Sequence, residues 1–175
     1  MFAIILLIIS GVILAAVVLY FGMQVLYAST MLHGPVFVPS KPKDVAQMIK
    51  LAQLKKSDKI LDLGSGDGTV VLALAKLGYQ AHGVDINPLL VRKARKKAVA
   101  LELSERVTFE RANFWSLDLS EYDVIFFYGT TYVMKKLEKK LFAELKPGSR
   151  VVSNYFEFPT WKPAREQGKI RVYEK

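Results

Sequence analysis

The sequence predicts an α/β fold, a mainly parallel sheet with helices on both faces, preceded by one N-terminal transmembrane helix. Two observations predict this. Short apolar runs alternate with helical stretches over residues 44–175, as in right-handed βαβ units. A long apolar segment without charge, residues 1–28, stands ahead of them. Residues 29–43 hold three prolines and a glycine, and are therefore expected to form a connector or loop.

The apolar segment is long enough to cross a bilayer. Residues 2–23 would make a helix of roughly 33 Å. No Lys or Arg precedes the segment, which argues against a cleaved signal peptide, and a buried core helix would rarely lack a polar face. The first charged side chain is Lys41, and further lysines follow it. Because basic residues stay on the cytoplasmic side, we expect a single-pass anchor with the globular domain in the cytoplasm.

The first elements of the domain are set by caps and glycines. Asp44 is expected to cap a helix that runs to about residue 54. The apolar run 59–63 ends at a glycine and is typical of a buried strand. A helix over 68–77 follows, and Gly78 is placed to end it.

The middle elements follow the same alternation. Residues 80–84 form an apolar run that predicts a second strand. Asn87 and Pro88 suit the cap and first position of a helix that continues to about residue 103. The run 106–110 is expected to be the third strand.

The last elements complete the predicted sheet. Residues 122–128 predict a fourth strand, and a helix over 131–145 follows it. The Lys-Pro-Gly sequence after that helix should end it. Residues 149–155 and 170–173 are expected to be the remaining two strands, so that few residues are left for a seventh.

A glycine-rich turn lies between the first strand and its helix. The sequence LDLGSGDG covers residues 61–68 and spaces its glycines as G-x-G-x-G. Open α/β sheets bind ligands at this place, outside the carboxyl end of a strand. Asp62 and Asp67 would repel a pyrophosphate, but they suit a cationic ligand. The amino group and sulfonium of S-adenosylmethionine are cationic, so this cofactor is favoured over a dinucleotide.

A second acid supports the same ligand. Asp85 ends the second strand and lies 23 residues after Asp62, close to the about 20 expected for an acid that binds a ribose. A carboxylate can accept hydrogen bonds from both ribose hydroxyls. The alternative interpretation is that the glycines form an ordinary turn and that Asp85 caps a helix.

Composition argues against several other classes. The net charge is +9, yet the basic runs look helical and lack interleaved aromatic residues, so we expect no nucleic-acid partner and a basic surface near anionic lipid. The chain has no cysteine, and His33 and His82 are not part of a metal-binding cluster. No serine stands in a G-x-S-x-G motif.

These motifs resemble the nucleotide-binding half of class I methyltransferases, which have a Rossmann-like fold. More narrowly, the chain is similar to a family of protein-lysine methyltransferases. That family includes the mitochondrial enzymes for the c subunit of ATP synthase and the adenine nucleotide translocase, and an archaeal broad-specificity enzyme. The similarity covers roughly residues 35–175. It rests on PVFVPSKP at 35–42, Asn113-Phe114-Trp115, LKPGSRVVS at 145–153, and FEFPTW at 156–161.

The resemblance implies S-adenosyl-L-methionine as the cofactor and a lysine side chain of a membrane or membrane-proximal protein as the substrate. The implied cofactor-binding residues are Pro39, Asp62, Gly64, Ser65, Gly66, Asp67, Gly68, Asp85, Ile86, Asn87, Asn113 and Phe114. In many relatives an acid takes the place of Asn113, whose amide oxygen can accept the same bond from adenine. The implied substrate-binding residues are Phe37, Tyr128, Tyr155 and Trp161, and the candidate catalytic residues are Tyr128, Glu157 and Trp161.

Three functions remain open on these grounds. The first is an anchored protein-lysine methyltransferase. The second is methylation of a lipid-soluble small molecule such as a quinone, which an anchor would serve equally well. The third is a non-catalytic module that binds the cofactor without turnover. No Asn-Pro-Pro-Tyr motif follows the fourth strand, where Tyr128-Gly129-Thr130 stands, which argues against methylation of nucleic-acid bases or glutamine.

Overall fold

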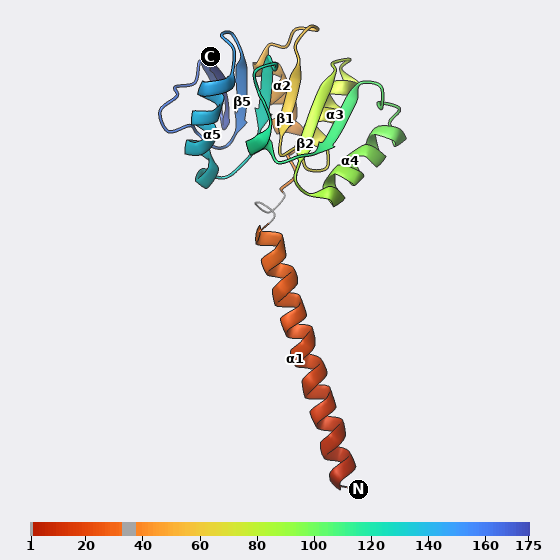
Figure 1. Ribbon diagram of the computed structural model, residues 1–175. Helices are drawn as coiled ribbons and strands as arrows, with labels where there is room; N and C mark the ends of the chain where they lie inside the picture. The colour runs from red at the N-terminus through yellow and green to blue at the C-terminus, as the bar shows by residue number, and fades with distance from the viewer. Residues whose placement is uncertain (1, 33–37) are drawn as a thin grey trace. The chain divides into compact units, whose positions relative to one another are not determined.

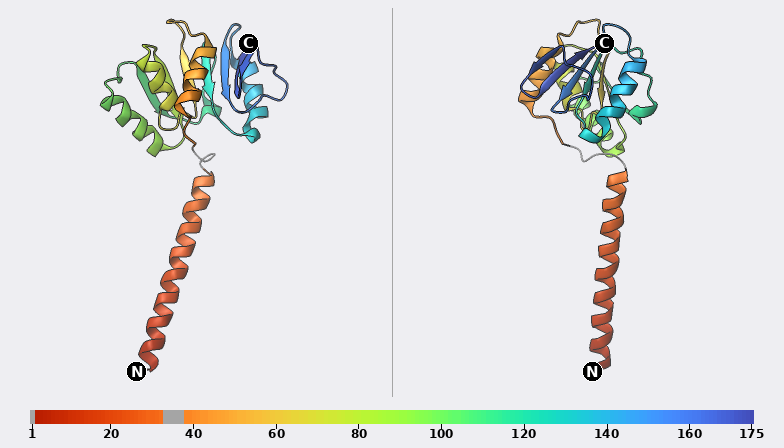
Figure 2. Two further views of the ribbon diagram at one scale, coloured as in Figure 1. Left: turned by 180° about the vertical axis from the view of Figure 1, so that it is seen from behind. Right: turned by 90° about the vertical axis from the view of Figure 1, so that its left-hand side faces the viewer.

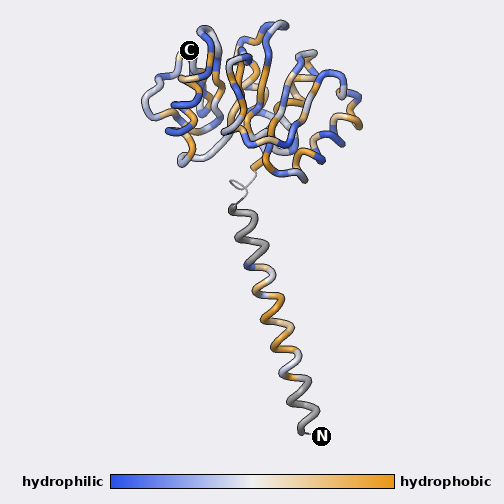
Figure 3. Tube along the Cα trace, in the orientation of Figure 1, coloured by the Kyte–Doolittle hydropathy of each residue, from blue (hydrophilic) through white to orange (hydrophobic). Residues whose placement is uncertain are grey.

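The computed structural model describes residues 2–32 and 38–175 (Figure 1). The chain divides into two compact units, Met1–Val36 and Phe37–Lys175. The described residues of the first unit form one helix, α1, Phe2–Leu32. Its side chains are described over residues 9–24, where apolar residues predominate (Figure 3). Within the described residues, no helix combines the length and hydropathy needed to cross a membrane.

The second unit is a sheet of seven strands in the order β3-β2-β1-β4-β5-β7-β6. The strands are β1 Ile60–Leu63, β2 Ala81–Asp85, β3 Val107–Arg111, β4 Val124–Phe127, β5 Arg150–Asn154, β6 Arg165–Gln167 and β7 Ile170–Glu174. Strands β1 to β5 are parallel to one another, whereas β7 runs antiparallel to both β5 and β6. The helices are α2 Pro42–Ala52, α3 Thr69–Lys76, α4 Pro88–Ala100, α5 Thr131–Glu144 and the short 3-10 helix η1 Phe114–Ser116.

Helices cover both faces of this sheet (Figure 2). Val45, Val70 and Val91, from α2, α3 and α4, pack in one core, and Leu137 of α5 packs in the other. All four residues of β1 and all four of β4 are buried, as expected for central strands that are covered on both sides. The predicted α/β fold with a mainly parallel sheet is therefore confirmed.

The predicted helix cap is confirmed at α4 and is wrong at α2. The Asn87 side chain accepts hydrogen bonds from the backbone N–H groups of Leu89 and Leu90 and caps α4, as predicted. Asp44 does not cap α2, which begins two residues earlier at Pro42, because proline is already set in a helical φ. Asp44 instead forms an ion pair with Lys169 at 2.8 Å.

The sheet has one strand more than the sequence predicted. Strand β6 contains three residues, Arg165–Gln167, and none of them is apolar. A strand this short and polar has no hydrophobic periodicity, so no sequence pattern indicated it. Its pairing with β7 completes a seven-stranded sheet even though the closing region is short.

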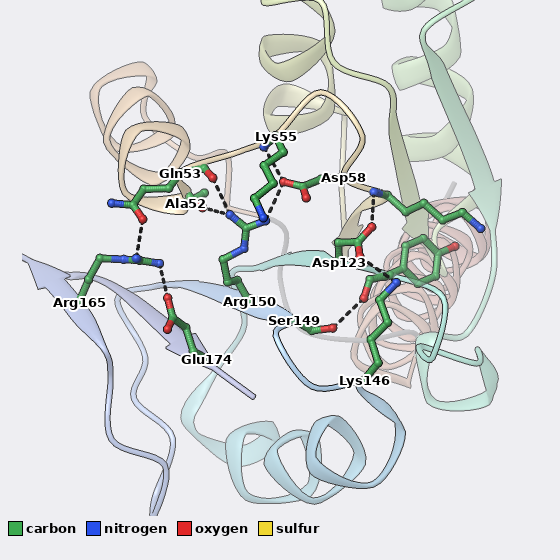
Figure 4. Close-up of polar contacts among 12 residues, drawn as sticks. Ala52, Gln53, Lys55, Asp58, Asp123, Lys146, Ser149, Arg150, Arg165 and Glu174 are labelled. Carbon is green, nitrogen blue, oxygen red and sulfur yellow. Dashed lines mark hydrogen bonds and ion pairs between the residues drawn. The ribbon is translucent and has the colours of Figure 1, made fainter.

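A buried arginine fixes the direction of α2 against the sheet (Figure 4). Arg150, the first residue of β5, donates to the carbonyl of Ala52 at 2.8 Å and to that of Gln53. It also forms an ion pair with Asp58 at 2.7 Å. The C-terminus of α2 is therefore held at the edge where the parallel strands begin. Its N-terminus must lie at the opposite edge, where those strands end.

Candidate functional site

The carboxyl ends of the parallel strands meet at one edge of the sheet. This edge carries the residues that directly follow β1, β2, β4 and β5, and also the N-termini of the helices α2 to α5. Ligands of open α/β sheets bind at such an edge. The described candidates for cofactor binding from the glycine turn and the end of β2 are brought together here.

The glycine turn lies tightly against the end of β2. The backbone N–H groups of Gly64 and Ser65 both donate to the carbonyl of Val84 at 2.9 Å. A Cβ atom at Gly83 would stand 2.8 Å from Ser65 Oγ and 2.9 Å from the Phe109 ring. Gly83, which precedes Val84 and Asp85 at the end of the second strand, is therefore required for this close approach.

Asp85 connects the glycine turn to the start of α4. One carboxylate oxygen accepts the backbone N–H of Gly66 at 2.9 Å, and the other accepts that of Asn87 at 2.8 Å. Carboxylate oxygens accept more than one hydrogen bond each, so Asp85 retains lone pairs for ligand hydroxyl groups. The two bonds hold its carboxylate in a fixed orientation at the edge.

Asp62 provides a buried carboxyl group beneath the turn. Its residue is 5% exposed, and burial together with the nearby charge of Asp85 raises its pKa to about 7. A buried carboxylate of this kind is stabilised by a cation placed near it. The carboxyl groups of Asp62 and Asp85 therefore suit a positively charged ligand at this edge.

Asp67 does not contribute to that selectivity. Its carboxylate pairs with Lys97 at 2.6 Å and with Lys93 at 3.2 Å, and it accepts the hydroxyl of Thr69 at 2.7 Å. Burial raises its pKa, but these three partners outweigh burial and hold the pKa below its usual value. Lys93 and Lys97 lie four residues apart on one face of α4 and neutralise the Asp67 carboxylate. The sequence had suggested that this carboxylate would attract a cationic ligand.

Open space and an unsatisfied polar atom remain inside the turn. Gly64 has a φ of 74°, and no atom lies within 4 Å of the position of an added Cβ. Ser65 Oγ is buried and has no hydrogen-bond partner among the described residues. A buried hydroxyl without a partner is costly, so it fits a ligand that supplies one. These features fit S-adenosyl-L-methionine.

The remaining cofactor candidates lie around the same edge. Ile86 is partly exposed directly after β2, and Pro39 is exposed ahead of α2. Asn113 caps η1, and its side-chain oxygen accepts the backbone N–H of Trp115 at 3.1 Å. The ring of Phe114 lies 4.7 Å from that of Trp115 and 6.1 Å from that of Phe127. The oxygen of Asn113 that was expected to face the adenine is thus already engaged by the backbone.

Three aromatic residues, Tyr128, Tyr155 and Phe156, lie in contact at the ends of β4 and β5, and this cluster is here called the aromatic mouth. The ring of Phe156 stacks on that of Tyr128 at 6.2 Å and meets the edge of Tyr155 at 5.1 Å. Tyr155 has a φ of 77°, which is strained for a residue with a side chain. Phe156 was missed as a site residue, although the aromatic run Tyr155-Phe156 after a strand could have indicated it.

Two candidate catalytic residues lie elsewhere than expected. Trp161 is buried, packs on Phe158 and Tyr173, and donates its indole N–H to the carbonyl of Glu174 at 3.2 Å. It therefore belongs to the core between α5 and the sheet, and the structure does not bring it to the mouth. Glu157 is exposed, and one of its carboxylate oxygens forms an ion pair with Arg171. Phe37 lies outside the described residues.

Known proteins resemble this chain in sequence. The pattern of the ANTKMT methyltransferase domain matches residues 62–165. A protein-lysine N-methyltransferase of Saccharolobus islandicus is 37% identical over 133 residues, which cover 75% of this chain and 82% of that protein. The lysine N-methyltransferase for the c subunit of ATP synthase in Rattus norvegicus is 35% identical over 133 residues, 76% of this chain. The matched region is 61% of the rat protein's length.

A solved structure agrees with these relatives. The RNA methyltransferase of Salinibacter ruber, in complex with S-adenosyl-L-homocysteine, is 37% identical and has a TM-score of 0.72. The match covers 78% of this chain and 91% of that one. The glycine turn and strands β2 to β5 lie within the residues that match the family pattern. This chain belongs to the family of the ANTKMT methyltransferase domain.

Proposed function

We propose that this chain is an S-adenosylmethionine-dependent protein-lysine N-methyltransferase. The observation that carries the proposal is the Asp62–Asp85 pair around an open glycine turn, inside the region that matches the family. The cofactor supplies an activated methyl group on a sulfonium. Gly64 and Ser65 would face it from the turn, Asp85 would accept its ribose hydroxyls, and Asp62 would balance its positive charge.

The aromatic mouth suits an incoming lysine. An ammonium with a pKa near 10.4 has no lone pair and must lose its proton before it can attack a methyl group. Tyr128, Tyr155 and Phe156 lie together as one aromatic cluster, and such rings would attract a cation and also desolvate it. Desolvation disfavours the charged amine, so the mouth would favour the neutral form that reacts. The rings would also hold the amine in line with the methyl group, which supplies alignment.

Two substitutions at Tyr155 distinguish the effect of losing its ring from the effect of relieving its strained backbone. We expect Tyr155→Gly to exceed Tyr155→Ala in free energy of unfolding by about 1 kcal/mol, because only glycine relieves the left-handed backbone. Both variants lose the ring, so both should lose lysine methylation about equally. Urea unfolding and a methyl-transfer assay measure the two quantities. Equal stabilities would show that the backbone strain is relieved in another way.

Trp161 should behave as a structural residue. Trp161→Phe is expected to lower the free energy of unfolding by about 2 kcal/mol, since it loses a hydrogen bond and leaves part of a buried space empty. Methyl transfer by the folded variant should be unchanged. A drop in kcat without a change in stability would instead support the catalytic role predicted from the sequence. Thermal unfolding beside steady-state kinetics decides between the two.

The proposed reaction can be tested directly. Full-length chain would be titrated with S-adenosylmethionine by calorimetry and then incubated with cofactor carrying a labelled methyl group and with solubilised membranes. We expect saturable binding and label on protein lysines, identified by mass spectrometry. Label in the lipid extract would identify a quinone-like small molecule as the substrate, and label on added RNA would identify RNA. Binding without label would indicate a non-catalytic module, and no binding would refute the proposal.

We also propose that residues 1–28 anchor the chain in a membrane as a single span, with the catalytic domain on the cytoplasmic side. The support is the uncharged apolar sequence together with the helical conformation of α1. Arginine at the centre of a span costs about 3 kcal/mol on insertion scales. Leu14→Arg should therefore release the chain from carbonate-washed membranes, whereas Leu14→Val should not. Release of the wild-type chain under the same wash would refute the anchor.

A further inference from the structure

Exposed apolar side chains gather at the edge of the sheet that carries the candidate site. Leu89 and Tyr132 are 74% and 96% exposed, and each is the second residue of a helix that begins at this edge, α4 and α5 (Figure 1). Three further exposed apolar residues lie directly after β2, directly after β5 and ahead of α2. The five together, here called the apolar rim, are Val38, Ile86, Leu89, Tyr132 and Tyr155.

The two helices repeat one pattern behind this rim. Arg92 and Lys93 follow Leu89 by three and four residues, and Lys135 and Lys136 follow Tyr132 by the same spacing. Residues with this spacing share one helix face, and one turn separates them along the axis by about 5.4 Å. All four basic side chains are exposed. Each helix therefore presents an apolar tip with basic residues one turn behind it. Arg92 and Lys135 carry the charge of this surface, because Lys93 pairs with Asp67 and Lys136 lies over the Trp115 ring.

The surrounding charge has the same sign. Lys41, Lys43 and Arg111 are also exposed at this edge. The carboxylates of Asp44 and Glu157 nearby are neutralised by Lys169 and Arg171. The opposite edge carries exposed residues of both signs in its loops, with Glu105 and Glu121 beside Lys55 and Arg106.

We propose that the apolar rim and the basic side chains behind it form a docking surface for an anionic lipid bilayer. Apolar groups at a membrane interface enter a bilayer by about 5–10 Å. Basic side chains just outside that depth are attracted to anionic headgroups by about 1 kcal/mol each. The one-turn offset between Leu89 or Tyr132 and the cations behind it matches that arrangement. A patch with this offset on two separate helices is better explained by a planar, negatively charged partner than by a single protein groove.

The docking surface would bring the proposed methyltransferase to its substrates, so the purpose of docking rests on the proposed function. Because Tyr155 belongs to both the rim and the aromatic mouth, a docked domain would open its mouth at the headgroup layer. The substrates would then be lysines of membrane proteins that lie at headgroup depth. Docking itself requires no methyl transfer, so the two proposals can fail separately.

The absence of cysteine from the chain makes the test simple. Full-length Leu89→Cys and Tyr132→Cys variants would carry an environment-sensitive NBD label, with Glu105→Cys at the opposite edge as the control. Each would be reconstituted in nanodiscs of phosphatidylcholine alone or with phosphatidylserine added. We expect blue-shifted emission at positions 89 and 132 in the anionic discs only, and none at position 105. The shift should disappear near 1 M salt, where the Debye length falls to about 3 Å.

A charge variant and a partner control complete the test. Arg92→Glu with Lys135→Glu, placed in the Tyr132→Cys background, should abolish the shift while the circular dichroism spectrum stays unchanged. Methylation of a free lysine peptide should survive these changes, because neither residue lies in the mouth. Unshifted emission at both positions in anionic discs would overturn the proposal. So would a shift that requires an added membrane protein, which would assign the surface to a protein partner.

Discussion

Replacement of Asp85 by alanine is expected to weaken the binding of S-adenosylmethionine by at least about 100-fold, since hydrogen bonds to a charged group contribute about 1.5–3 kcal/mol each. The change removes the acceptor proposed for the ribose hydroxyls. It also frees the backbone N–H groups of Gly66 and Asn87, which Asp85 holds at 2.9 and 2.8 Å. Calorimetry on the full-length protein would measure the dissociation constant.

Two matched variants make the Asp85 result specific. Asp85→Asn keeps one acceptor oxygen and should give an intermediate loss, whereas Glu105→Ala removes an exposed acid at the opposite edge and should change nothing. A second readout concerns Asp62, whose pKa is raised in part by the charge of Asp85. In Asp85→Ala that pKa should therefore fall. An affinity within about threefold of the wild type, in a variant that retains its fold, would contradict the proposed ribose contact.

Asp62→Asn is expected to stabilise the protein above pH 7 while weakening cofactor binding. The folded-state pKa of Asp62 is about 7, against 3.8 for the free group. The stabilising effect of the protonated carboxyl is fully present below pH 3.8 and is lost as the pH rises through 7. The loss is on the order of 4 kcal/mol by proton linkage. Asparagine stays neutral, so Asp62→Asn does not lose this stability as the pH rises.

The comparison of the two proteins at two pH values isolates this effect. Urea unfolding at pH 5 and pH 8 should show Asp62→Asn gaining stability relative to the wild type at the higher pH. Glu105→Gln should show no such gain. If the difference between Asp62→Asn and the wild type is the same at both pH values, then Asp62 does not titrate near 7.

Cofactor binding should respond in the opposite direction. Wild-type affinity is expected to fall as the pH drops below 7, because protonated Asp62 no longer attracts the cationic cofactor. Asp62→Asn should bind more weakly at pH 8, and its affinity should depend less on pH between 6 and 8. The residue would thus be retained for ligand binding at a cost in stability, a common feature of functional sites. Stronger binding by Asp62→Asn at pH 8 would contradict the proposed role.

Most of the fold could be predicted from the sequence because its signals are local. Strand β1 is an apolar run closed by Gly64, and α4 begins at an Asn-Pro pair that caps it, as the sequence indicated. The order of acids and glycines along the chain was sufficient to indicate a ligand edge and the family. Strand β6 was missed because three polar residues form a strand only through pairing with β7.

The roles of individual side chains depended on contacts between distant segments. The sequence could not show that Asp67 is neutralised by Lys97, 30 residues away, or that Glu157 pairs with Arg171. Trp161 looked like a residue of the mouth, but packing against Tyr173 buries it in the core. The sequence by itself determined the fold class and the edge of the sheet at which a ligand is expected. It also determined that Asp62 and Asp85 stand at this edge, since both follow from local periodicity and chain order. Only the tertiary structure decided which charges face the ligand, because ion pairs and burial arise when segments far apart in the chain pack together.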